Sequence, residues 1–225
     1  MRVTKRNLSE YIFFLGILVL LSVAGCGGGG GSSAGGSTSN ILKTAIGDHW
    51  TISGPNTNTT SGVGVTDNIS ITTTNISYSG GVVTASSIVT TNGVAASSVS
   101  VTSSIEPSTG NFVLTNYFGA SGKTILLPAA YAVGSSWTYL AASGVTSAIP
   151  ATISAINVSR TVPAGTFNDC IKINLGPYTS SSVTLNNILY FSPTAGQVVE
   201  ASYSGVATNF TYSSLLKLQA GYVAN

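Results

Sequence analysis

The sequence predicts an all-β domain, and two observations support this prediction. Apolar side chains repeatedly alternate with polar ones, as at Ile149, Ala151 and Ile153, which is the period of a strand with one buried face. No stretch keeps the apolar spacing of about 3.6 residues that an amphipathic helix requires. We therefore expect a single domain of antiparallel strands joined by hairpins.

A signal peptide is predicted to precede this domain. The cations Arg2, Lys5 and Arg6 come before an apolar run. That run, residues 11–23, ends in small residues, as a signal peptide does. A helix over it would be about 20 Å long, whereas the hydrocarbon core of a bilayer is about 30 Å thick. Residues 1–25 therefore read as a signal peptide rather than as a membrane-spanning helix.

The end of this segment, Val23-Ala24-Gly25-Cys26, resembles the lipobox of bacterial lipoproteins. The resemblance implies diacylglycerol on the Cys26 thiol, cleavage before Cys26 and acylation of the new amino terminus. Each buried CH₂ contributes about 0.8 kcal/mol, so palmitate-like chains on this cysteine would hold the protein on a lipid bilayer. An ordinary secretory peptide that happens to contain a cysteine is the alternative.

Residues 26–40 follow as a predicted tether, because their Gly and Ser residues cannot build a core. Such a segment is expected to be a flexible coil with a mean span of about 20 Å. Gly27 and Gly28 stand where, by resemblance to enterobacterial lipoproteins, an Asp would signal retention in the inner membrane. The resemblance thus implies the outer membrane of a Gram-negative cell envelope.

The predicted domain, residues 41–225, carries few charges. The whole chain has a formal net charge of +2, but three of its cations lie in the signal peptide. After cleavage the formal net charge is zero, because five basic and five acidic residues remain. They are Lys43, Lys123, Arg160, Lys172 and Lys217, and Asp48, Asp67, Glu106, Asp169 and Glu200. A neutral chain lacks the basic surface that nucleic-acid binding needs, so we expect no nucleic-acid partner.

Two tryptophans stand in motifs of the same form. Residues 47–52 and 134–139 each contain a glycine, two polar residues, a Trp, a Thr and an apolar residue. We expect Trp50 and Trp137 to anchor the core and to be largely buried, since an indole removes about 150–250 Å² from water. A Trp that stacks on a sugar is the alternative.

Successive hairpins are predicted between the two tryptophans. Apolar alternation over residues 63–71 resumes in the opposite phase at 76–78, which predicts a bulge near Thr74 and Asn75. Further strands are expected at 82–89, 99–105 and 112–118, separated by turn residues.

The string Gly119 to Thr124 ends in the GKT of a phosphate-binding loop. That loop needs a glycine where this chain has Tyr117, and it needs a following helix. Here a short apolar stretch is ended by Pro128, so a hairpin turn is predicted instead.

The segment Val162 to Leu175 is predicted to turn and then launch a strand. Pro163 presets φ near −65° and Gly165 supplies a permissive backbone, by general conformational preference. The strand is expected to place on one face its alternating apolar residues, Phe167, Ile171, Ile173 and Leu175.

A second hairpin is predicted from Tyr190 to Tyr203. The chain is expected to turn at residues 193–196 and to continue with period two at Val199, Ala201 and Tyr203. The last segment, residues 214–220, fits either a helical turn or a final strand.

Few residues could carry chemistry. His49 is the one histidine, and its neighbour Asp48 would point to the opposite face of a strand. The G-x-S-x-G pattern at residues 31–35 lies in the tether, without the strand and helix that an esterase places around it. Cys170 is expected to be reduced and poorly accessible. We expect no catalytic residues, no metal site and no cofactor.

The motifs around Trp137, Pro163 to Phe167 and Tyr190 to Val198 resemble those of a large set of poorly characterised bacterial envelope lipoproteins. Some members are similar to half-barrel domains of the lipoprotein-carrier type. The resemblance implies a curved antiparallel sheet or half-barrel with an apolar concave face, and a β-sandwich is the alternative. It implies almost nothing about activity, since function depends on sites rather than folds.

Three hypotheses for function follow. The first is a non-catalytic envelope lipoprotein that binds a protein partner or supports surface structure. The second is a half-barrel carrier or sensor of a hydrophobic ligand, and the third is an envelope hydrolase. We favour binding over catalysis, because one histidine and five carboxylates give the mature chain few ways to build a tuned base or a metal site.

We predict that Cys26 is the lipidated first residue of the mature protein. Metabolic labelling with a fatty-acid analogue should mark the wild type and miss the Cys26→Ser variant, because the thiol is the site of attachment. Equal labelling of the two chains would refute the prediction.

Overall fold

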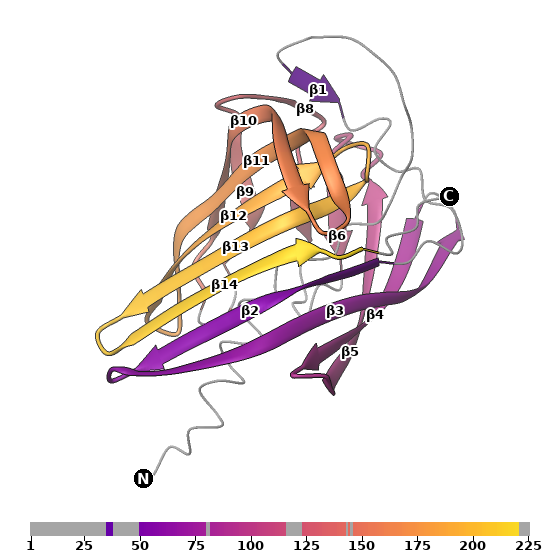
Figure 1. Ribbon diagram of the computed structural model, residues 1–225. Coiled ribbons are helices and arrows are strands. Elements are labelled where there is room, and N and C mark those ends of the chain that lie inside the picture. The colour runs from indigo at the N-terminus through magenta and orange to yellow at the C-terminus, as the bar shows by residue number, and fades with distance from the viewer. Residues whose placement is uncertain are drawn as a thin grey trace.

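The computed structural model describes residues 35–37, 50–79, 82–115, 123–142, 144 and 146–220 (Figure 1). The regular structure of these residues is β-strand throughout. The strands are β1 (Gly35–Ser37), β2 (Trp50–Thr60), β3 (Val63–Ser79), β4 (Val82–Thr91), β5 (Val94–Ile105), β6 (Phe112–Thr115), β7 (Thr124–Leu127), β8 (Ala130–Ala132), β9 (Ser136–Leu140), β10 (Ile149–Val162), β11 (Gly165–Ser180), β12 (Val183–Ser192), β13 (Gln197–Ala207) and β14 (Phe210–Leu218). None of the described residues belongs to a helix that could cross a membrane.

One antiparallel sheet makes up nearly the whole described structure. Its strand order is β10-β11-β12-β13-β14-β2-β3-β4-β5-β6-β7-β9, and β9 pairs in turn with β10. The strands thus form a closed ring, but β7 and β9 are paired at only one position, Thr124 with Leu140. This arrangement confirms the prediction of one all-β domain with a curved antiparallel sheet.

The large buried cluster of the protein lies on one face of this sheet, which we call the inner face. It contains alternate residues of the long strands, among them Ile52, Ile71, Ile153, Ile173, Leu189 and Leu216. Directly paired residues of neighbouring strands lie on the same face, so the register extends this assignment from strand to strand. Burial of these alternate apolar residues is the main force that stabilises the sheet.

Several predicted turns and strands are confirmed. The register between β3 and β4 shifts between Thr73 and Asn75, where the change of apolar phase predicted a bulge. Strands β6 and β7 pair antiparallel, as the hairpin prediction for Gly119 to Thr124 requires, although the turn itself lies outside the described residues. Residues 210–218 form β14, which decides for the strand over the helical turn.

The hairpin of β10 and β11 bends over the outer face of the sheet. Its turn is fastened to the last strand by a hydrogen bond of 3.1 Å, which the Ala164 amide donates to the Leu218 carbonyl oxygen. Beneath the hairpin lies a second buried cluster: Val162, Cys170, Tyr190, Ala195, Val199 and Leu218. The outer face is therefore covered at this place, in addition to the filled inner face.

Two bulges place side chains on the opposite face of the sheet from the one predicted. Val158 pairs with Cys170 but Arg160 pairs with Phe167, so β11 has one extra residue there. Phe167 consequently packs on the second cluster and not on the inner face with Ile171.

The same correction applies to β13. Tyr190 pairs with Glu200 but Phe191 pairs with Val198, so the extra residue is Val199. Val199 joins the second cluster, whereas Ala201 and Tyr203 belong to the inner cluster. A bulge inserts one residue and reverses the faces beyond it, which a strict period of two does not anticipate.

The predicted tether also needs a correction. Gly35–Ser37 forms β1 and pairs antiparallel with β8, through Gly35 with Ala132 and Ser37 with Ala130. A strand ladder uses backbone groups, so glycine and serine can add to an exposed strand without a core of their own. The rest of residues 1–40, including Cys26, lies outside the described residues.

We predict that Gly54→Ala destabilises the domain by about 1–3 kcal/mol or more, whereas Gly64→Ala has little effect. A Cβ at Gly54 would overlap the backbone carbonyl of Leu215, which cannot move away like a side chain. A Cβ at Gly64, on the neighbouring strand, would meet only the Thr59 hydroxyl at 3.6 Å. Midpoints of denaturant unfolding measure both effects, and equal midpoints for the two variants would contradict the close approach of β2 and β14.

Candidate functional site

The predicted anchors lie in different parts of the structure. Trp50 begins β2, where its backbone pairs with Thr73. Trp137 is partly rather than largely buried, packs on the inner cluster and donates a hydrogen bond of 2.8 Å from Nε1 to the Ile125 carbonyl oxygen. Cys26 and His49 lie outside the described residues, so their predicted roles stay predictions.

The turn residues occupy the tip of the β10–β11 hairpin. Pro163 is exposed between the two strands, and Gly165 has a φ of 135°, which favours glycine. Phe167 packs against the second cluster. These residues shape the hairpin and bring no reactive groups together.

Asp169 joins the two motifs that the sequence singled out. Its carboxylate accepts a hydrogen bond of 2.7 Å from the Ser192 hydroxyl and another of 2.7 Å from the Thr194 amide. Asp169 belongs to the segment Val162 to Leu175, and it thereby binds the β12–β13 turn within the segment Tyr190 to Tyr203. This bonding gives the two segments a structural reason to occur together, because a carboxylate satisfies turn donors well.

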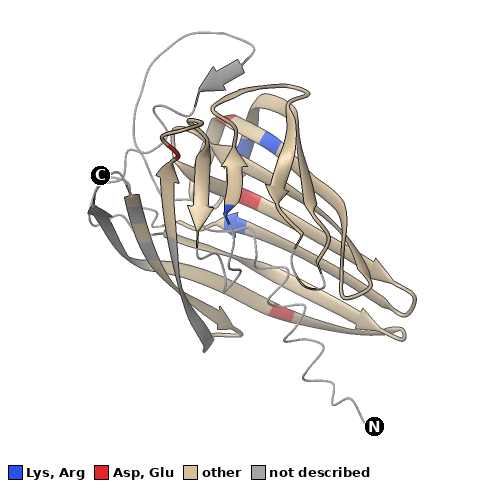
Figure 2. Ribbon diagram, turned by 180° about the vertical axis from the view of Figure 1, so that it is seen from behind, with Lys and Arg blue, Asp and Glu red and all other residues tan. Residues whose placement is uncertain are grey.

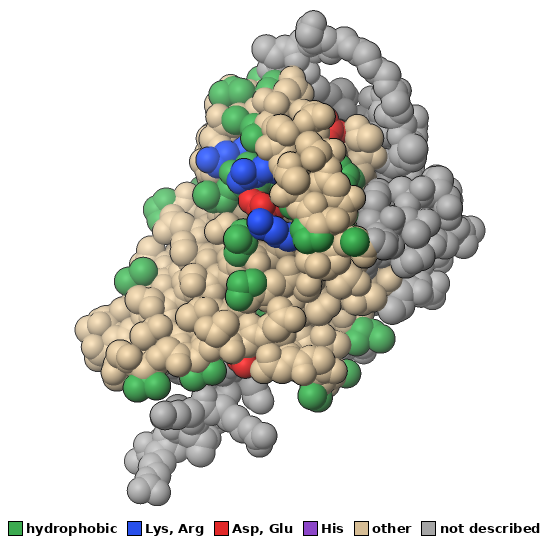
Figure 3. All heavy atoms as spheres, in the orientation of Figure 1, with side chains coloured by type: hydrophobic (Ala, Val, Ile, Leu, Met, Phe, Trp, Pro, Cys, Tyr) green, Lys and Arg blue, Asp and Glu red, His purple; other side chains and the backbone are tan. Residues whose placement is uncertain are grey.

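An ionic cluster lies beside the same hairpin, on a chain that otherwise has few charged residues (Figure 2). Arg160 Nη2 is 2.9 Å from one oxygen of Glu200, and Lys217 Nζ is 3.8 Å from the other. The Arg160 guanidinium lies 3.6 Å from the centre of the Tyr190 ring. Figure 3 shows these cationic and anionic side chains gathered on one face.

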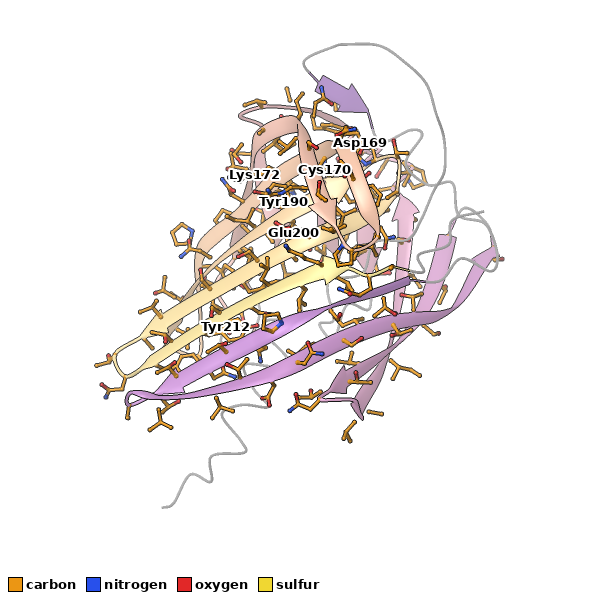
Figure 4. All side chains as sticks on the ribbon, in the orientation of Figure 1. Asp169, Cys170, Lys172, Tyr190, Glu200 and Tyr212 are labelled. Atoms are coloured by element: carbon orange, nitrogen blue, oxygen red, sulfur yellow. The ribbon has the colours of Figure 1, made fainter. Side chains whose placement is uncertain are left out.

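The ionic cluster has a structural role, because it attaches the β10–β11 hairpin to the sheet. Glu200 is buried, and a buried carboxylate needs partners to offset the loss of water. Figure 4 shows Tyr190 and Glu200 close to the hairpin that carries Asp169 and Cys170. The pairs therefore hold β10 onto β13.

Cys170 is a buried free thiol within the second cluster. Burial raises its pKa to about 12, and the nearby Asp169 carboxylate acts in the same direction. A thiol in this state is a poor nucleophile. Among the described residues, no group of His, Cys, Asp and Glu could hold a metal ion.

The inner face carries a different kind of site, a row of polar side chains across five neighbouring strands. Asn187 of β12 pairs with Tyr203 of β13, Tyr203 with Ser214 of β14, Ser214 with Asn56 of β2, and Asn56 with Asp67 of β3. We call these residues the polar belt: Asn56, Asp67, Asn187, Tyr203 and Ser214. Paired positions share a face, so the belt crosses the sheet without a break.

Three members of the belt are almost fully buried and have unsatisfied oxygens. The exposed fractions of Asn56, Asn187 and Tyr203 are 3%, 2% and 1%. Asn56 Oδ1, Asn187 Oδ1 and the Tyr203 hydroxyl have no hydrogen-bond partner in the protein. Buried polar atoms are normally bonded, because an unsatisfied one costs about 1–3 kcal/mol.

Several other polar groups of the belt do have partners. Asn187 Nδ2 donates to the Tyr178 hydroxyl at 2.9 Å, and the Ser214 hydroxyl donates to the Pro55 carbonyl oxygen at 3.1 Å. Asp67 accepts a hydrogen bond of 2.8 Å from Asn92. Buried polar atoms without a partner also occur outside the belt, for example Asn58 Oδ1, Ser103 Oγ and Asn174 Oδ1.

The tyrosines of this region remain protonated. Burial raises the pKa of Tyr178 to about 12 and also raises the pKa of Tyr203 and of Tyr212. The neighbouring phenols of Tyr212, Tyr139 and Tyr178 add to the rise in the pKa of Tyr203. At neutral pH the site therefore offers uncharged hydroxyl and amide groups.

Inward-facing valines lie exposed next to the belt. Val65 pairs with Asn58, and Val63 pairs with Thr60, so both valines lie on the inner face near the β2–β3 turn. The exposed fraction of Val65 is 56%, although it is only two residues from Asp67 of the belt. We call Val63 and Val65 the valine lip.

No motif or spacing in the sequence predicted the polar belt. Asn56, Asn187 and Ser214 are common polar types in a chain rich in Ser, Thr and Asn, and only the register of pairing brings them into one row with Asp67 and Tyr203. A useful signal would have been Asn56 and Tyr203, which are polar residues at positions where strand alternation calls for apolar ones.

Comparison with known proteins adds little. No protein-family model and no curated protein matches the chain. The chain is similar to a Bacteroides fragilis protein assigned as exported, with a YmcC-like fold, at 11% identity and a TM-score of 0.41, over 78% of this chain and 97% of that one. It is also similar to a Parabacteroides distasonis protein assigned as a lipoprotein, at 14% identity and a TM-score of 0.39, over 75% of this chain and 94% of that one.

We predict that Cys170 in the Cys26→Ser chain reacts slowly with iodoacetamide at pH 8. A pKa of about 12 leaves only about one thiol in ten thousand ionised at that pH. The same raised pKa implies that the free energy of unfolding falls as pH rises from about 9 towards 12, because the unfolded thiol loses its proton first. The denatured chain is the control, and equally rapid labelling of folded and denatured chains would contradict the prediction.

Proposed function

We propose that this protein is a lipid-anchored lipoprotein of the cell envelope whose all-β domain acts by binding rather than by catalysis. The lipobox at Cys26 supports the anchor. The valine lip supports binding, since it exposes apolar surface on the inner face.

The valine lip carries this proposal. Exposed apolar side chains on the inner face can be covered by a small molecule or an inserted chain. This position favours a ligand held inside the curved sheet over a partner on its outside. The carrier or sensor hypothesis therefore gains over the hypothesis of a docking surface.

The tether fits this arrangement. Eight residues separate Cys26 from Gly35 of β1, and at about 3.4 Å each they can reach at most about 30 Å. A lipid on Cys26 would hold the β1 and β8 end of the domain near the bilayer. The β2–β3 and β13–β14 turns lie at the opposite end, so the valine lip would face away from the anchoring membrane (Figure 1).

The test is binding of the neutral apolar dye N-phenyl-1-naphthylamine. The chain from Cys26 to Asn225 with Cys26→Ser contains all described residues and avoids acylation. We expect the dye to fluoresce with this chain and to bind about tenfold more weakly to Val65→Lys, because a charge replaces apolar surface on the inner face.

The matched control is Val206→Lys. Val206 is 60% exposed, like Val65, but it pairs with Thr211 on the outer face. Unchanged dye affinity in this control is expected. Absence of dye binding, or an equal loss in both variants, would refute binding at the inner face.

A further inference from the structure

We propose that a cationic patch on the outer face of the sheet rests on the anionic phosphate groups of the bilayer that holds Cys26. The patch consists of Arg160, Lys172 and Lys217, which are three of the four cations among the described residues. The inference shares the lipid anchor with the proposed function and goes beyond it, because it concerns the outer face and the orientation of the domain rather than a ligand on the inner face.

The strand register gathers the patch on the outer face. Lys172 of β11 pairs with Tyr190 of β12, and Tyr190 pairs with Glu200 of β13 (Figure 4). Glu200 pairs in turn with Lys217 of β14, so these side chains form one row across four strands. Arg160 joins the row from the β10–β11 hairpin, where its guanidinium lies over the Tyr190 ring.

The patch contains more positive than negative charge. Arg160 and Lys217 both pair with one carboxylate, that of Glu200. Lys172 is partly exposed and makes no ion pair with any residue of the described ranges. Asp169 lies nearby on β11, so the region holds three cations and two carboxylates.

The other charges of the described residues do not cancel this excess. Lys123 is paired with Glu106, at the other end of β5 from the β4–β5 turn. Asp67 belongs to the polar belt on the inner face. The outer face of β11 to β14 is therefore the positive region of a domain that is neutral as a whole (Figure 3).

The tether brings this region close to the bilayer. Its strand β1 pairs with β8, and the turn after β8 is bonded to β10, where the Gly134 amide donates to the Ile153 carbonyl oxygen at 2.8 Å. Ala155, two residues further along β10, pairs with Lys172. The patch thus begins about 7 Å along β10 and about 5 Å across the sheet from the point where the tethered end is attached.

The length of the tether makes a weak attraction effective. At most about 30 Å of chain separates Cys26 from β1, and such a short link gives the patch an effective concentration in the mM range at the bilayer surface. An anionic bilayer attracts Lys and Arg side chains that come within about 10 Å of it at 0.1 M salt. The acyl chains already hold the protein, so this attraction orients the domain.

The spacing of the cations favours a surface over a small anion. Lys172 and Lys217 are three strands apart, which is about 14 Å at about 4.8 Å for each strand. One phosphate cannot contact both, whereas a bilayer offers many phosphates side by side.

The test is co-sedimentation of the chain from Cys26 to Asn225, with Cys26→Ser, with lipid vesicles. One kind of vesicle contains equal amounts of anionic phosphatidylglycerol and phosphatidylcholine, and the other contains phosphatidylcholine alone. At low salt we expect binding to the anionic vesicles to be at least about tenfold stronger. The difference should vanish at about 1 M salt, where the screening length falls to about 3 Å.

The Lys172→Gln variant tests the patch directly. We expect it to bind the anionic vesicles about three- to fivefold more weakly, and Lys172→Arg to bind them as the wild type does. Neither change breaks an ion pair within the described residues, so the unfolding midpoint should stay the same. Lys123→Gln is the control, because it changes the net charge equally outside the patch and should leave binding unchanged.

Three outcomes would overturn this inference: equal binding to the two kinds of vesicle, absence of binding to both, or an equal loss in Lys172→Gln and Lys123→Gln. Competition by glycerol 3-phosphate as strong as that by anionic vesicles would assign the patch to a small anion and would also overturn it. Dye binding at the inner face should be the same in Lys172→Gln as in the wild type, so the failure of either proposal leaves the other standing.

Discussion

Pairing between β14 and β2 is the interaction on which the rest of the structure depends. It joins the last described strand to the first long strand, from Phe210 with Thr60 to Leu218 with Ile52. The Gln219 side chain adds a hydrogen bond of 3.3 Å to the Ser53 carbonyl oxygen. Without this pairing the two halves of the sheet would be joined only through the single β7–β9 pair, and the belt would be divided between Tyr203 on one half and Asn56 on the other. Such a distant contact closes a long loop, which costs conformational entropy and slows folding.

The strands could be predicted from the sequence, but the faces of some residues could not. The bulge near Asn75 was predictable because apolar residues change phase on both sides of it. The bulge near Phe167 gives no such signal, since β11 becomes buried on both faces directly after it: Cys170 and Ile171 are neighbours and both are buried. When both faces are apolar, alternation disappears and an extra residue leaves no trace in the pattern. The same reason explains Val199, which follows the buried Val198.

The candidate site could not be predicted for a different reason. Local patterns predict hairpins, and hairpin partners such as Asn187 and Tyr203 can be aligned once the β12–β13 turn is placed. The step from Ser214 to Asn56 is not local, because β14 and β2 meet only in the folded sheet. A row of polar residues across that junction exists only in the tertiary register. Asp169, by contrast, lies within a motif that the sequence did single out, and its bonds to Ser192 and Thr194 are structural.

The energetics of the belt explain why its position matters. Three unsatisfied buried oxygens at about 1–3 kcal/mol each would consume a large part of the roughly 5–15 kcal/mol that stabilises a folded domain. An apolar row at the same level, like the one that contains Ile173 and Leu189, would avoid this loss. The belt therefore lowers the stability that a fully apolar row would give. The hydrogen bonds that belt residues do form, from Asn187 to the Tyr178 hydroxyl and from Ser214 to the Pro55 carbonyl oxygen, offset part of this cost.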